Sequence, residues 1–158
     1  YQFTRSGPIK KLLTEAKGIY EPEARRLYIE IRFDVKDPLW RVEISRNHMQ
    51  FALNNLINNA IDAIPNKGNI TIITKQENHN VLIIIRDNGI GIPVENLNKI
   101  FDPFFTTKQD GLGVGLAISR SIVEAHGGRL SYEDRSGGGS TFIVRLPVLK
   151  DSEQQNRQ

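Results

Sequence analysis

The sequence predicts an α+β domain built as a two-layer α/β sandwich, in which a mixed, mainly antiparallel sheet of about five strands is covered on one face by three helices. Two observations lead to this prediction: most expected strands arrive as hairpins, and helical segments lie between them. The length of 158 residues and the hydrophobic content of 39% suit a single core. We expect a linker at 1–7, the domain at 8–149 and a disordered polar tail at 150–158.

The first part of the domain is expected to form a helix, one or two strands and a second helix. Over residues 8–25, apolar residues recur at spacings of three and four, which predicts an amphipathic helix. The alternation over 27–33 predicts a half-buried strand, and a second short strand is expected near 41–44. Ser45 has the residue type of an N-cap for the next helix, over 47–64.

The second part of the domain is expected to hold two hairpins, separated by a long irregular stretch and a helix. The expected ranges are 69–75 and 80–86 for the first hairpin, 88–111 for the irregular stretch, 113–125 for the helix, and 129–134 and 140–147 for the second hairpin. Glycines end the third helix and join the last two strands.

The composition excludes several functional classes. The chain has no cysteine, which excludes a disulfide framework and a thiolate metal site. No apolar run of about 18 residues is present, so we expect no direct membrane insertion and a cytoplasmic domain. The net charge of +3 comes without the clustered basic and aromatic residues of nucleic-acid-binding proteins, so DNA and RNA are not expected as partners.

The helix over 47–64 carries the first chemical signal. Asn55, Asn59 and Asp62 follow at i, i+4 and i+7, opposite the apolar face of the helix. The four asparagines of 54–59 should cost about 2 kcal/mol relative to alanine, and such a break of a local rule often marks a functional site. Amide oxygens in a row suit a magnesium ion that phosphates already hold. The alternative is an ordinary solvated helix face.

The second signal is Asp87, which directly follows an apolar strand and begins the sequence Asp-Asn-Gly-Ile-Gly. A carboxylate there can accept a hydrogen bond from an exocyclic amine such as that of adenine. Gly89 and Gly91 would let the backbone approach the base closely. An ordinary turn at the end of a strand is the alternative.

The third signal is the glycine-rich run at 111–115, which leads into a helix. The N–H groups and the dipole of a helix start form an anion site suited to phosphates, although the run matches neither the P-loop nor the dinucleotide fingerprint. The preceding stretch is too long for an idle connection, so we expect a lid, in which Lys108 can reach a phosphate. A flexible loop and plain core phenylalanines are the alternatives.

Together these motifs resemble the four conserved boxes of the ATP-binding catalytic domain of bacterial sensor histidine kinases. The N box is at 55–60, the first glycine box at 87–91, the F box at 101–105 and the second glycine box at 111–115. Their order and spacing resemble the family shared with type II topoisomerases, mismatch-repair ATPases and ATP-driven chaperones, over about residues 8–148. The lid and the sequence Ala-His-Gly-Gly at 125–128 resemble the branch of nitrogen-regulation, oxygen-sensing and sporulation kinases.

The resemblance implies a Bergerat ATP-binding fold and a role for each matching residue. Asn59 would coordinate Mg²⁺, Asp87 would recognise adenine, and the segment 92–112 would close over the nucleotide. Asn55 and Asn59 are the expected catalytic residues, and Leu112 stands where many relatives have Thr or Ser, so that hydroxyl contact is absent. The expected ATP-binding residues are Asn55, Asn59, Asp62, Asp87, Gly89, Gly91, Ile92, Phe101, Thr107, Lys108, Gly111, Leu112, Gly113, Val114, Gly115 and Leu116.

Asn55 favours phosphoryl transfer over ATP hydrolysis. Members of the resembled family that hydrolyse ATP generally carry a glutamate four residues before the magnesium asparagine, as a general base for water. An amide cannot take a proton at neutral pH, so transfer to another nucleophile is the better interpretation. An ATP-gated clamp and a nucleotide-binding module that transfers no phosphate stay open as alternatives, which an ATPase assay and a phosphotransfer assay distinguish.

The acceptor histidine is expected on another domain. His48, His79 and His126 all lack the acidic neighbour and the Arg-x-Pro element of the phosphoacceptor box, and we expect a structural role for His126 at the end of its helix. Residues 1–5 resemble the last turn of the dimerisation helix. The resemblance implies three partners: a dimerisation and phosphoacceptor domain of the same kinase, a second copy dimerised through it, and a response regulator. A membrane anchor elsewhere in the parent kinase is compatible with this reading.

Overall fold

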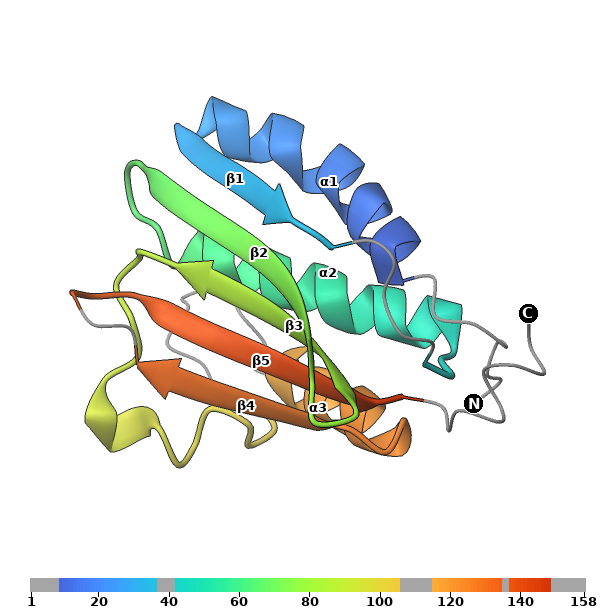
Figure 1. The fold of residues 1–158 in the computed structure, drawn as a ribbon. Helices are drawn as coiled ribbons and strands as arrows, with labels where there is room; N and C mark the ends of the chain where they lie inside the picture. Colours follow the sequence, from blue (N-terminus) through green and yellow to red (C-terminus); the bar gives the residue numbers. More distant parts are fainter. Residues whose placement is uncertain (1–8, 37–41, 106–114, 135–136, 149–158) are drawn as a thin grey trace.

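The computed structural model describes residues 9–36, 42–105, 115–134 and 137–148, which form helices, a single strand and two strand pairs (Figure 1). The elements are α1 (Ile9–Arg26), β1 (Ile29–Asp34), α2 (Arg46–Asp62), β2 (Gly68–Glu77), β3 (Asn80–Asp87), the 3-10 helix η1 (Val94–Asn96), α3 (Gly115–Ala125), β4 (Arg129–Asp134) and β5 (Ser140–Pro147). The linker expected at 1–7 and the tail expected at 150–158 lie outside the described residues.

The strands form one five-stranded sheet in the order β1-β2-β3-β5-β4. β1 pairs with β2 in parallel, whereas the β2–β3, β3–β5 and β4–β5 pairs are antiparallel. The expectation of a mixed, mainly antiparallel sheet is therefore confirmed. β5, the last strand of the described residues, lies between β3 and β4 (Figure 1).

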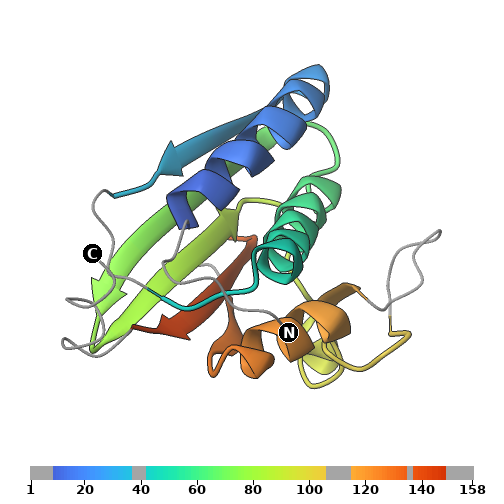
Figure 2. The ribbon, with the colours of Figure 1, turned by 90° about the vertical axis from the view of Figure 1, so that its right-hand side faces the viewer.

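The three helices lie on one face of this sheet, which confirms the two-layer sandwich (Figure 2). α1 packs on β1, α2 on β3 and α3 on β4. The core lies between the layers, where each large aliphatic side chain of α2 that is fully buried stabilises the fold by about 2 kcal/mol relative to exposure. The side chains that α2 contributes to this core are Met49, Ala52, Leu53, Leu56, Ile57, Ala60 and Ile61. Over the described residues, the helices lack the length and apolar character needed to span a bilayer.

Two strand predictions differ from the structure. The strand expected near 41–44 is wrong, because the described residues there form only an isolated bridge at Ile44. Val42 and Ile44 are nevertheless buried, so the apolar alternation marked an extended segment packed on the core and not a ladder. β1 begins at Ile29 and not at residue 27, because Tyr28 adopts a left-handed conformation with φ of 59° and turns the chain after α1.

A buried histidine links the C-terminal end of α3 to the N-terminal end of α2. Ser45 occupies the N-cap position as predicted, but its side chain makes no cap hydrogen bond. Its backbone N–H donates instead to Nε2 of His126 at 2.9 Å, and its Oγ pairs with Nδ1 of His48 at 2.7 Å. Nδ1 of His126 lies 2.7 Å from the carbonyl oxygen of Ile122, so Nδ1 carries the proton of a neutral ring.

The surroundings of His126 favour this neutral form. Burial lowers its pKa, and the nearby His48 acts in the same direction, while the hydrogen bond to the Ile122 carbonyl opposes both. The side chain is 8% exposed, and both ring nitrogens have backbone partners. The structural role expected for His126 is confirmed.

Candidate functional site

The polar row predicted on α2 is present in the structure, and we call its two asparagines, Asn55 and Asn59, the amide row. Asn55 and Asn59 are one turn apart and half-buried, and Asp62 is exposed in the last turn of the helix. The apolar residues between them face the sheet, because the 3.6-residue period puts the two sets on opposite sides. The row therefore lies on the side of α2 that is turned away from the sheet.

Asp87 is a buried carboxylate at the end of β3, 2% exposed. The side chains of Val81, Ile83 and Ile85 alternate into the core beneath the helices, and Asp87 continues this series because successive residues of a strand point to opposite faces. Its Oδ1 accepts a hydrogen bond from the backbone N–H of Gly89 at 2.8 Å. A carboxylate in this position can accept a further hydrogen bond from a ligand that enters from the helix side.

The turn after Asp87 is fixed by close backbone packing. The N–H of Ile90 donates to the carbonyl oxygen of Ala63 at 2.9 Å, just beyond the end of α2. A Cβ atom at Gly89 would overlap that carbonyl group, and a Cβ atom at Gly139 would overlap the carbonyl oxygen of Asp87. Glycine at these two positions therefore lets the backbones of the turn, the end of α2 and the start of β5 pack against one another. The expectation that Gly89 and Gly91 admit a base stays a prediction.

The N-terminal end of α3 lies directly against the amide row. A Cβ atom at Gly115 would lie 2.5 Å from Oδ1 of Asn55, so the amide occupies the space that the missing side chain leaves. Nδ2 of Asn55 donates to Oγ of Ser119 at 3.1 Å, one turn further along α3. Leu116, in the first turn, is half-buried and packs against the core. The structure therefore brings Gly115 and Leu116 to the same side of α2 as Asn55.

Sequence reasoning missed Ser119. Its position four residues after Gly115, on the face of α3 that also carries Ile122, is the signal that would have found it, because a polar residue on a core face needs a partner. Six of the expected site residues lie outside the described part of the chain: Thr107, Lys108, Gly111, Leu112, Gly113 and Val114.

The segment after the Asp87 turn is attached to the sheet at its beginning. Ile92 is half-buried, and its backbone hydrogen-bonds to the hydroxyl of Tyr132 on β4. That hydroxyl donates to Oδ1 of Asp134 at 2.9 Å, and burial raises the pKa of Tyr132, so the group stays protonated at neutral pH. The segment expected to act as a lid therefore starts from a fixed anchor.

The phenylalanines of the F box divide between the core and the surface. Phe101 is half-buried against the core, and the guanidinium of Arg120 lies 5.3 Å from its ring centroid, within cation–π range. Phe105 also packs on the core, whereas Phe104 is 76% exposed and has a positive φ of 69°. The core alternative thus fits Phe101 and Phe105, and contact of Phe101 with a nucleotide stays a prediction.

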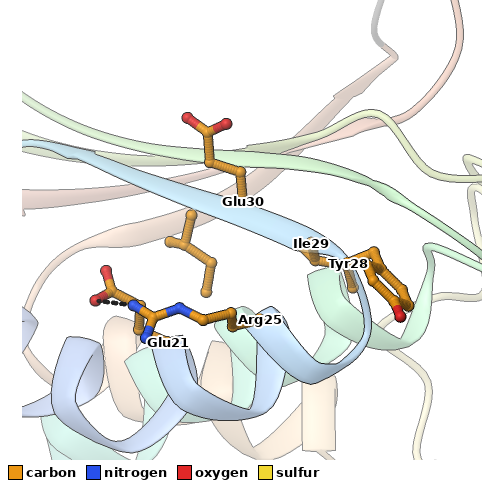
Figure 3. A pocket seen from close by; sticks show the side chains of 6 residues that line it. Glu21, Arg25, Tyr28, Ile29 and Glu30 are labelled. Atoms are coloured by element: carbon orange, nitrogen blue, oxygen red, sulfur yellow. Dashed lines mark ion pairs between the residues drawn. The ribbon is translucent and has the colours of Figure 1, made fainter.

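A shallow cavity of about 400 Å³ lies at the other edge of the sheet, between the C-terminal end of α1 and β1 (Figure 3). Its wall includes an ion pair between the half-buried Glu21 and the exposed Arg25, with 3.5 Å between nitrogen and oxygen. An ion pair already neutralises the charges that a phosphate would need, and the predicted site residues do not line this cavity. The candidate site is therefore the region formed by α2, the turn after β3 and the start of α3.

Comparison with known proteins identifies the family. Residues 44–150 match the family described as histidine kinase-, DNA gyrase B-, and HSP90-like ATPases. The chain is 35% identical to the sensor histidine kinase ZraS of Salmonella typhi over 89% of its length, and 32% identical to sporulation kinase A of Bacillus subtilis over 88%. It spans 30% and 23% of the length of these two relatives.

Solved structures give the same result. The catalytic domain of histidine kinase ThkA, in a nucleotide-free form, superposes with a TM-score of 0.85 and 36% identity, covering 94% of this chain and 97% of that domain. A complex of ThkA with the response regulator protein TrrA superposes with a TM-score of 0.79 and 34% identity, covering 93% of this chain and 42% of the ThkA chain. The chain belongs to the histidine kinase-, DNA gyrase B- and HSP90-like ATPase family, within which it is an ATP-binding catalytic domain of the sensor histidine kinase type.

Proposed function

We propose that this domain binds Mg-ATP between α2, the Asp87 turn and the N-terminal end of α3, and donates the γ-phosphate to a histidine on a separate dimerisation domain. The observation that carries the proposal is the meeting of three chemically distinct parts: a buried acceptor for the adenine amine, a row of amide oxygens, and a helix start packed on that row. Together they suit the base, the metal and the phosphates of one nucleotide.

The metal would be held by few protein ligands. Among the described residues, His, Asp and Glu form no group of three or more suited to a metal ion. Amide oxygens on adjacent turns, with Asn59 as the metal ligand and Asn55 beside it, fit an ion that takes most of its oxygens from phosphates and water. When bound, Mg²⁺ would neutralise part of the negative charge of the phosphates.

Phosphoryl transfer would then rest on positioning. The incoming imidazole nitrogen attacks the γ-phosphorus as the bond to the bridging oxygen of ADP breaks, and the protein aligns the two groups and stabilises charge. Asn55 provides an amide where a hydrolytic enzyme needs a base, and its nitrogen already donates to Ser119. We therefore expect transfer to be faster than hydrolysis.

The acceptor is proposed to come from outside the domain. His126 is buried with both ring nitrogens bonded, and Nδ1 of His48 pairs with Ser45. The expected partners are the dimerisation domain of the same kinase, which would also make the dimer, and then a response regulator. The relative ThkA has been crystallised with such a regulator, which supports that second partner.

The test uses labelled ATP, the domain and a fragment that carries the phosphoacceptor histidine of the same kinase. We expect acid-labile, base-stable phosphate on the fragment, and none on the domain alone. Binding of ATP without any transfer would favour the nucleotide-binding module. Release of inorganic phosphate faster than transfer would favour the ATP-gated clamp.

A further inference from the structure

The contact between Asn55 of α2 and Ser119 of α3 is polar and partly buried. Ser119 is 0% exposed, and its Oγ accepts a hydrogen bond from Nδ2 of Asn55 at 3.1 Å. Serine is not a strong helix former, and a buried hydroxyl group needs a hydrogen-bond partner. The burial of Ser119 therefore requires a partner such as Asn55. The bond ties the amide of one helix to the core side of the other.

The amide of Asn55 is also confined from a second direction. A Cβ atom at Gly115 would lie 2.5 Å from Oδ1 and 2.8 Å from Nδ2 of Asn55, so the amide fills the gap that this glycine leaves. Ser119 lies one turn beyond Gly115 on α3. The nitrogen of the amide therefore faces Ser119, and the oxygen lies towards the N-terminal end of α3.

We propose that Ser119 is a positioning residue, which accepts the Nδ2 hydrogen bond so that Oδ1 of Asn55 faces the metal and phosphates of Mg-ATP. This inference rests on the function proposed above. An amide has one oxygen end and one N–H end, and Mg²⁺ binds oxygen, so a rotated amide would present donors to a cation. By accepting this bond the hydroxyl holds the amide in the observed orientation, in the way that an outer-shell partner orients a metal ligand.

The experiment compares Ser119→Ala with wild-type domain in a Mg²⁺ titration at a fixed concentration of a fluorescent ATP analogue. Loss of an orienting partner typically weakens metal affinity 10- to 100-fold, so we expect half-saturation at about 10-fold higher Mg²⁺. Binding of the analogue in EDTA should not change. Ser121→Ala is the matched control, because Ser121 is an exposed serine of the same helix.

A double-mutant cycle with Asn55→Ala separates positioning from general damage. If Ser119 acts through Asn55, the double variant should need no more Mg²⁺ than Asn55→Ala alone. Additive effects, an unchanged Mg²⁺ requirement in Ser119→Ala, or equal weakening in EDTA would each overturn the inference. A wild-type domain that binds the analogue without any response to Mg²⁺ would instead overturn the proposed function. Thermal unfolding of each variant establishes that it is folded.

Discussion

Hydrogen bonds join α2 and α3 at two levels, that is, at two points along the helices. The two levels differ in how far the fold encloses the bonded groups. At one level, the N–H of Ser45 donates to the buried His126, whose other ring nitrogen is bonded to α3 itself. At the other, ten residues along α2 and hence about 15 Å away, the half-buried Asn55 bonds to Ser119 beside a glycine. The first level is closed on all sides, and the second borders the surface.

The difference separates a bond enclosed within the fold from a bond at the proposed nucleotide site. His126 has used both ring nitrogens within the fold, so it has nothing left to offer a ligand. Asn55 donates through its nitrogen to Ser119, and an amide oxygen has two lone pairs available for other partners. Changes at the first level should therefore alter stability, and changes at the second should alter metal-dependent binding.

The largest expected effect is on stability, from His126→Ala. The change removes a buried ring and leaves the N–H of Ser45 without its acceptor, so we expect a loss of about 3 kcal/mol in the free energy of unfolding, measured in urea. ATP affinity of the folded fraction should stay unchanged. His48→Ala is the control, with a loss below about 1 kcal/mol, because that side chain is exposed. A loss of ATP affinity in the folded His126 variant would break the proposed separation.

The next effect is on binding, from Asp87→Asn. The isosteric amide can still accept the N–H of Gly89, but it loses the charge that strengthens a hydrogen bond from the adenine amine. We expect ATP to bind about 30-fold more weakly by calorimetry, which corresponds to about 2 kcal/mol. Asp34→Asn, an exposed carboxylate at the end of β1, should leave affinity intact. Unchanged affinity in Asp87→Asn would refute the adenine assignment.

The smallest effect is a pH dependence of stability from His126. Its pKa is lowered in the folded state, so the unfolded chain takes up a proton first as the pH falls below about 6.5. Stability should therefore fall from that pH downwards, by at most about 1.4 kcal/mol per pH unit from this one proton, and be insensitive to His126 above it. Urea unfolding from pH 7.5 to 5.0 measures this, with His126→Gln as the comparison. Equal slopes in the two proteins would show that another group is responsible.

The sequence predicted the layers and most elements because each depends on local periodicity. The apolar face of α2 and the two hairpins follow from spacings of 3.6 and 2 residues, and the structure agrees with them to within a few residues. Asp87 was accessible to the same reasoning, since a carboxylate directly after an apolar strand breaks the pattern. The strand expected near 41–44 failed because alternation reports burial and does not report a pairing partner.

The contacts that assemble the site were not predictable in this way. Ser119 looks like an ordinary helix residue until α2 approaches α3, and Gly139 looks like part of a loop until β5 is placed against β3. Both depend on which segments meet in space. The family resemblance supplied the expected roles, and the packing supplied the neighbours that hold those residues.

The position of β5 has a consequence for how the domain is made. Gly139 and β5 close the turn around Asp87, yet they are synthesised 50 or more residues later and must enter between β3 and β4. Such a late, non-local pairing is slow to form and leaves strand edges unpaired until it does. A chain still emerging from the ribosome would carry the whole amide row before the turn around Asp87 was closed. Nucleotide affinity would thus appear only when β5 pairs with β3.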